Sequence, residues 1–244
     1  MDPALQITAH RPFPLPNRPW IMKQVWHDLL FAHWPNAPDE MRRLVREPLE
    51  LDLYEGEAWA GVIPFHMSGV RGRAMPPVPG ASAFPELNVR TYVRYKGITG
   101  VYFFSLDAGS RLAVWGARAS YALPYYFARM SVTANGSRIE YSSSRAHAEA
   151  DFEGSYAPTS SVELSAPGSL QHFLTERYCL YTVDLKHQVR RAVIHHLPWP
   201  LQNAEGEIRS NTMADAAGIA LPSTPAQLHF SKRLEVLVWC PELA

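Results

Sequence analysis

Lysine is scarce in this sequence. Of the 23 basic residues 19 are Arg, and the four lysines are Lys23, Lys96, Lys186 and Lys232. Chemistry that requires a lysine amine, such as imine formation with a carbonyl substrate, therefore has four candidates in all. Asp and Glu together also number 23, so the formal net charge is zero. Without a broad positive field, we expect neither nucleic acid nor an anionic membrane as a partner.

Cysteine and long apolar runs are scarce too. Cys179 and Cys240 are the only cysteines and lack CxxC spacing, so neither a disulfide framework nor a thiolate metal site is indicated. We expect no metal and no cofactor. No apolar run approaches the ~20 residues that span a bilayer, and the first residues lack a signal-peptide pattern. These absences predict a soluble, cytoplasmic protein.

The common signature motifs are absent as well. HExxH, GxxxxGK[ST] and GxGxxG do not occur, so the usual signals for zinc proteases, phosphate loops and dinucleotide binding fail. The segment Gly80–Phe84 begins like a nucleophile elbow, but Phe replaces its second Gly. His195 and His196 are neighbours on an expected strand, so they cannot jointly chelate one metal, although either one could still ligate or catalyse.

What the sequence has in quantity is strand-like alternation and aromatic residues. Apolar spacing predicts helices over 20–34, 38–45 (capped by Asn36 or Asp39), 110–123, 169–176 and 211–217. Alternation and turn signals predict strands over 51–54, 58–67, 87–93, 100–106, 125–132, 138–144, 146–156, 178–183, 189–195 and 228–240. We expect an α+β fold that is mainly antiparallel β, formed as one domain over residues 1–244 with an extended N-terminal arm at 1–19.

The stretch 84–108 predicts a central hairpin that turns at Lys96-Gly97. On its first strand Glu86, Asn88, Arg90 and Tyr92 share one face, because side chains alternate with a period of two. That face looks toward either water or an internal cavity, and the sequence does not decide which. A Glu–Arg pair that is purely structural is an equal alternative.

Two further candidates have structural alternatives of their own. Arg71 belongs to the proline-rich segment 69–85, which is interpreted either as a lid over a site or as a semi-rigid connection. His33 lies close to the apolar stripe of 20–34. A hydrogen-bonded core histidine is its simpler explanation, beside a functional one.

Several segments resemble the YqjF-like family of uncharacterised bacterial proteins. They are HDLLFAHWP (27–35), AWAGVIPFHM (58–67), FPELNVRTYV (84–93), GVYFFSLDA (100–108), LPYYFARM (123–130) and LTERYCLY (174–181). That family looks like a distant branch of the acetoacetate decarboxylase-like fold. The resemblance implies a cone-shaped β-barrel with a few short peripheral helices and a ligand cavity inside.

The resemblance also implies what has been lost. Acetoacetate decarboxylases form a Schiff base through one of two adjacent lysines, in a segment similar to GxPKK. The matching place in this sequence is Leu123-Pro-Tyr125-Tyr126, and a phenol cannot form an imine. Glu86 resembles the family's glutamate on the strand before the hairpin.

The leading hypothesis is a cavity for a small organic acid or carbonyl compound, with acid/base chemistry that uses no lysine. The catalytic candidates are Glu86, Arg90, Tyr125 and Tyr126, and the substrate-binding candidates are Asn88, Tyr92, Arg71 and His33. A non-catalytic protein that binds an apolar or aromatic ligand is the main alternative, and a purely structural domain is a third. The sequence leaves a homo-oligomer open.

Overall fold

The structure is a computed structural model that describes residues 2–121, 123–184 and 186–244. Strands dominate these ranges and form one 13-stranded sheet. They are β1 (Met22–Asn36), β2 (Glu50–Leu51), β3 (Ala58–Gly72), β4 (Phe84–Tyr95), β5 (Ile98–Ala108), β6 (Tyr125–Asn135), β7 (Arg138–Arg145), β8 (Asp151–Pro158), β9 (Cys179–Val183), β10 (Val189–His195), β11 (Gln202–Asn211), β12 (Gln227–Val238) and β13 (Glu242–Leu243). The helices are α1 (Pro38–Leu44), α2 (Arg111–Tyr121), α3 (Leu170–Thr175) and the 3-10 helices η1 (Pro3–Gln6) and η2 (Asp215–Ala217).

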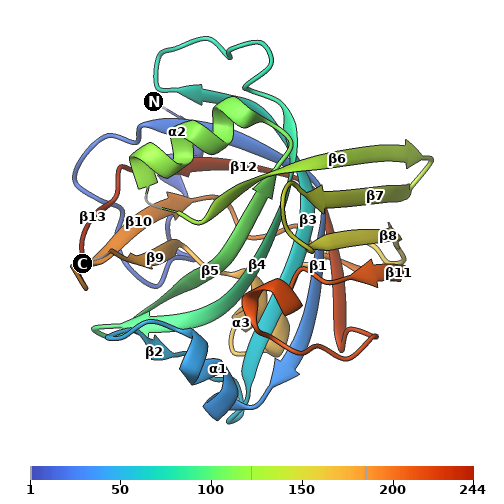
Figure 1. The fold of residues 1–244 in the computed structure, drawn as a ribbon. Coiled ribbons are helices and arrows are strands. Elements are labelled where there is room, and N and C mark those ends of the chain that lie inside the picture. Colours follow the sequence, from blue (N-terminus) through green and yellow to red (C-terminus); the bar gives the residue numbers. More distant parts are fainter. Residues whose placement is uncertain (1, 122, 185) are drawn as a thin grey trace.

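The sheet is mostly antiparallel, as the sequence predicts. In the described residues only β6 and β9 pair in parallel, each with β5. The order of hydrogen-bonded strands returns on itself, because β5 also pairs with β4 and β12 pairs with β1, β10 and β11. The long strands β1, β3, β4 and β5 curve side by side, with α2 across one end and α1 and α3 near the other (Figure 1). None of the helices in the described ranges has the length and apolar character that crossing a bilayer requires.

The central hairpin is confirmed, as β4 and β5 pair along their length. Its turn is formed by Lys96 and Gly97, which both have positive φ angles of 49° and 77°. Glycine adopts that conformation without steric cost, which is why the Lys-Gly signal can be read from the sequence. The Asn135-Gly136 signal is also confirmed, since β6 and β7 pair directly across it.

The helix predicted over 20–34 is wrong, because this segment is strand β1. Its register against β3 shifts between Lys23 and Val25 and again between His27 and Ala32, and Asp28 has a φ of 49°. The first shift adds a residue to β3, because Lys23 and Val25 lie opposite Arg71 and Ser68. The second adds a residue to β1 near Asp28, and it moves the apolar side chains that follow to the other face. This change of phase gives the strand part of the i, i+3, i+4 spacing of a helix.

The other short elements agree in part. Helix α1 starts at Pro38 as predicted, but Ala37 occupies its N-cap position without a side-chain hydrogen bond, so the predicted capping residues are wrong. Helix α3 is confirmed with its Ser169 cap. The helix predicted over 110–123 is α2, and residue 122 of that range lies outside the described residues. The helix predicted over 211–217 is reduced to η2, because residues 202–211 form strand β11.

Pairing of the segment 51–54 with the strand at 58–67 is limited to one bridge between Tyr54 and Glu57. Strand β2 pairs with β4 instead. In its described residues, the N-terminal arm contains only η1 as regular structure. It lies against the end of β10, where Arg11 donates to the carbonyl of Ile194 at 2.8 Å.

Candidate functional site

A pocket of about 330 Å³ lies between the curved strands, α2 and the segment around α3. This volume is at the lower end of the range typical of small-molecule sites, roughly 300–1,000 Å³. Most of its lining is aromatic or aliphatic. Its main polar side chains are Glu86, Asn88, Arg90, Tyr125, Thr175, Arg177 and His196.

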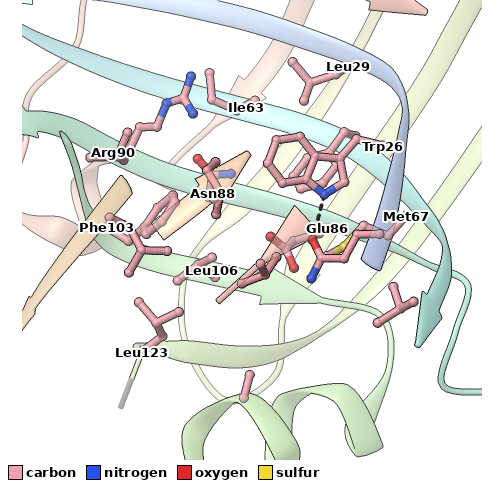
Figure 2. A pocket seen from close by; sticks show the side chains of 18 of the residues that line it. Trp26, Leu29, Ile63, Met67, Glu86, Asn88, Arg90, Phe103, Leu106 and Leu123 are labelled. Atoms are coloured by element: carbon pink, nitrogen blue, oxygen red, sulfur yellow. Dashed lines mark hydrogen bonds between the residues drawn. The ribbon is translucent and has the colours of Figure 1, made fainter. Parts of the chain in front are cut away.

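Three of the predicted residues reach this pocket from one strand. Glu86, Asn88 and Arg90 project from β4 one after another (Figure 2). Alternation along the strand puts all three on the inner face. The open question of which way this face looks is thereby answered for these three residues.

Glu86 is a buried acid, with only 3% of its surface exposed. The hydroxyl of Tyr125 donates a hydrogen bond to its Oε2 at 2.9 Å. Burial raises the pKa of Glu86 to about 8, and the nearby negative charge of Asp107 adds to the increase, while the Tyr125 hydrogen bond opposes it. Glu86 is therefore mainly protonated at neutral pH and can donate a proton.

Arg90 has no carboxylate partner. In the described part of the chain it forms no ion pair, and its Nε and Nη2 have no hydrogen-bond acceptor. Its guanidinium lies 5.3 Å from the centroid of the Phe31 ring, which is a cation–π distance. The structure therefore shows no Glu86–Arg90 ion pair, which the structural alternative for these residues required.

A second guanidinium at the pocket has a carboxylate partner, which it shares with Arg94. Arg177 donates to Asp52 at 2.6 Å and to the carbonyl of Phe173 at 2.7 Å, and it lies on the Phe173 ring at 4.3 Å. With Glu86 protonated, Arg90 contributes one positive charge that no carboxylate balances. A ligand with a single negative charge would supply the missing partner.

The remaining predicted residues lie away from the pocket lining. His33 and Tyr92 are fully buried and pair with each other, with Nε2 2.6 Å from the phenol oxygen. The Tyr92 hydroxyl in turn donates to the carbonyl of Leu174 at 2.6 Å. Burial, together with the positive charge of Arg90, holds the pKa of His33 well below its usual value. His33 is thus a hydrogen-bonded core histidine, which is the simpler of the two explanations that the sequence allows.

Tyr126 also points elsewhere. Its ring lies 4.1 Å from the guanidinium of Arg145, which forms a buried ion pair with Asp107 through two hydrogen bonds of 2.7 Å. Tyr125 and Tyr126 are neighbours on a strand, so only one of them can face the pocket. The catalytic assignment of Tyr126 is not supported by this placement.

Arg71 donates to the carbonyl of Gly69 at 3.2 Å and does not line the pocket. The segment between β3 and β4 touches the pocket through Ala81, and the carbonyl of Gly80 accepts from Ser110 just before α2 at 3.4 Å. The segment therefore borders the pocket, and its role as a lid stays a prediction.

Several lining residues were missed. Arg177, His196, Trp26 and Trp199 all face the pocket. Burial lowers the pKa of His196 to about 4, so this imidazole is neutral at pH 7. Its neighbour His195 faces the opposite way, toward Arg11 at 3.1 Å, as alternation along the strand requires. Trp26 escaped notice because its segment was expected to be helical.

Among the described residues, the pocket has neither a lysine in its lining nor a cluster of side chains that could bind a metal. No lysine lines the pocket in the described residues, and Lys23 on β1 pairs with Asp2 at 2.8 Å and Glu235 at 2.7 Å. The same residues contain no group of three or more His, Cys, Asp or Glu side chains that could hold a metal ion.

Comparison with known proteins decides the family. The model of a family described as an uncharacterized conserved protein, DUF2071, matches residues 23–235. The chain belongs to this family. It is 50% identical over 226 residues to the uncharacterized protein YqjF of Bacillus subtilis (strain 168), which covers 92% of this chain and 93% of that protein. The resemblance to the YqjF-like family is thereby confirmed.

Solved structures place the DUF2071 chain among acetoacetate decarboxylase-like folds. Acetoacetate decarboxylase from Legionella pneumophila superposes with a TM-score of 0.65 at 10% identity, covering 96% of this chain and 93% of that one. The enduracididine biosynthesis enzyme MppR superposes with a TM-score of 0.62 at 12% identity, covering 93% and 90%. At these identities the comparison shows the fold alone.

Proposed function

We propose that the pocket binds a small organic acid or carbonyl compound and that Glu86 and Arg90 carry out acid/base chemistry on it without a Schiff base. The proposal includes the cone-shaped β-barrel, with the ring of strand pairings as the wall around the pocket. One observation carries it. Arg90 and Glu86 face the same small, mainly apolar pocket. In the described residues the Arg90 guanidinium has no carboxylate partner, and the Glu86 carboxyl is protonated at neutral pH.

Each side chain has a separate task in this proposal. Arg90 binds the ligand's carboxylate, because a guanidinium can donate two parallel hydrogen bonds to it. Glu86 donates a proton or a hydrogen bond to the carbonyl oxygen as negative charge develops there. Tyr125 orients Glu86 through its hydroxyl, and Asn88 lies between Glu86 and Arg90 on the strand. Substituting tyrosine for the lysine pair removes imine formation.

The printed description of one structural neighbour supports this ligand class. MppR has been solved in complex with pyruvate, a small keto acid. A keto acid has both features that the pocket accommodates, a carboxylate for Arg90 and a carbonyl oxygen for Glu86.

The test is a panel of small keto and hydroxy acids assayed for binding and turnover. We expect Arg90→Ala to abolish turnover and to weaken binding of the carboxylate at least tenfold, whereas Arg43→Ala, which removes an exposed arginine on α1, leaves both unchanged. Borohydride treatment with the same ketones should give no protein adduct. A covalent adduct at any lysine would contradict the proposal.

The apolar lining favours one alternative, a non-catalytic protein that binds an apolar or aromatic ligand in the same pocket. Trp26, Phe65, Phe103 and Trp199 all border the pocket and can contact such a ligand with their rings. This alternative predicts that a ligand is retained by both the wild type and Arg90→Ala, with no turnover of any acid.

A further inference from the structure

A second pocket, of about 310 Å³, is bordered by the residue that starts α2 and by β6, β7 and the turn that follows β7. Figure 1 shows β6 and β7 leaving the curved strands beside α2. It is lined by Arg111, Phe127, Arg129, Ser144, Arg145, Ala146 and His147. None of these residues lines the first pocket, so the two sites are separate.

The second pocket carries an excess of positive charge. Three arginines line it, and Asp107 compensates only one of them, Arg145. Within the described ranges Arg111 and Arg129 form no ion pair, and no carboxylate is among the lining residues. Two positive charges are thus left over in a chain whose formal net charge is zero.

The guanidinium of Arg145 is held in place before any ligand arrives, and that of Arg111 lies against an aromatic ring. Nε and Nη2 of Arg145 donate to Asp107 and its plane lies on Tyr126, which leaves Nη1 outside the ion pair. Arg111 lies 4.6 Å from the ring of Phe127. Because Arg145 is already fixed, it loses less conformational entropy on binding than the exposed Arg111 and Arg129 do.

The strand pairing adds further donors. Arg129 on β6 lies directly opposite Ser144 on β7, so these two side chains project from neighbouring positions. His147 follows in the turn and also lines the pocket. A hydroxyl and an imidazole therefore accompany the three guanidinium groups.

We propose that this second pocket binds a phosphate group, presented either as inorganic phosphate or as a phosphate monoester. A phosphate carries about −1.5 to −2 charges at pH 7 and three acceptor oxygens. It matches the two uncompensated positive charges, which a single carboxylate would not. Arginine is also the side chain that best pairs with phosphate oxygens in a planar, two-point contact.

The test is isothermal titration with inorganic phosphate, and separately with glycerol phosphate, at low and at moderate salt. We expect saturable binding that weakens as salt increases. The double variant Arg111→Ala/Arg129→Ala should lose at least tenfold in affinity. Arg111→Lys/Arg129→Lys should retain part of it. Arg145 is left intact, because removing it would strand Asp107 inside the protein.

Two controls make the result specific. Arg43→Ala removes one exposed positive charge elsewhere and should change the affinity less than twofold. Arg90→Ala disables the first pocket and should leave phosphate binding unchanged, so this inference can fail or hold independently of the proposed function.

Tighter binding of glycerol phosphate than of inorganic phosphate would identify a monoester as the ligand, and equal binding would identify phosphate itself. No saturable binding of either probe, or equal binding by the double variant, would overturn the inference.

Discussion

Replacing Glu86 by Gln should change how the stability of the protein depends on pH. A buried carboxyl that is protonated in the folded chain must either lose its proton or be exposed as the pH rises. Gln keeps the size and an acceptor for the Tyr125 hydroxyl but cannot ionise. The variant therefore removes the titration and leaves the packing nearly unchanged.

The direction and the size of this pH dependence follow from the difference in proton binding between the folded and unfolded states. The pKa of Glu86 is about 8 in the folded chain and has an ordinary value of 4.5. Between these pH values the folded state binds more protons than the unfolded state, so the wild type loses stability as the pH rises through this window. At about 1.4 kcal/mol for each pH unit of difference, the loss in the free energy of unfolding is on the order of 5 kcal/mol. Below pH 4.5 this loss is absent.

Urea unfolding of wild type and Glu86→Gln from pH 4 to pH 9 measures this effect. We expect the free energy of unfolding of the variant, relative to wild type, to increase by several kcal/mol between pH 4.5 and pH 8. Glu149→Gln, which alters an exposed glutamate, should give a difference that does not vary with pH. If the difference for Glu86→Gln is equally flat, the carboxyl ionises normally in the folded protein, and its role as a proton donor at neutral pH is refuted.

Three further predictions concern packing and buried ion pairs. Arg145→Met should destabilise the protein by about 3–5 kcal/mol, because it leaves Asp107 buried without its partner, and thermal unfolding measures the loss. Gly100→Ala should lower the melting temperature, since its new Cβ would come within 2.8 Å of the sulfur of Cys179, and Gly97→Ala serves as a contrast that tests turn strain instead. Tyr141→Phe should cost about 1–3 kcal/mol in urea unfolding, because its buried hydroxyl donates its one hydrogen to the main-chain carbonyl of Glu86 at 2.7 Å, with the carbonyl of Phe65 at 3.2 Å.

The parts of the fold that the sequence predicts correctly are those with local causes. The turns at Lys96-Gly97 and Asn135-Gly136 require only the conformational freedom of a glycine, and the start of α1 requires only Pro38. Strand β11 is different. Its alternating residues are largely polar and exposed, and it forms because β8 and β12 offer hydrogen bonds on its two sides. Nothing local signals a strand that depends on distant partners.

The same distinction applies to the site. Glu86, Asn88 and Arg90 could be assigned to one face together, because a single strand carries them. Arg177 and His196 come from segments far along the chain, and the pairing of β9 with β5 and of β10 with β12 brings them to the pocket. Tyr125 and Tyr126 cannot both belong to the site, and the sequence already indicates this. Alternation along β6 prevents two adjacent side chains from facing the same cavity.

The spacing along β4 explains why Glu86 and Arg90 do not form an ion pair with each other. Four residues at roughly 3.3 Å each separate the backbones of Glu86 and Arg90 by about 13 Å. The described structure contains no ion pair between them, and burial then favours the neutral form of the acid, while the guanidinium keeps its charge. Side chains two residues apart on the same face are close enough to form an internal salt bridge, and each group would then have a partner within the protein. The longer spacing leaves a guanidinium at one end of this row and a protonated carboxyl at the other, with Asn88 between them.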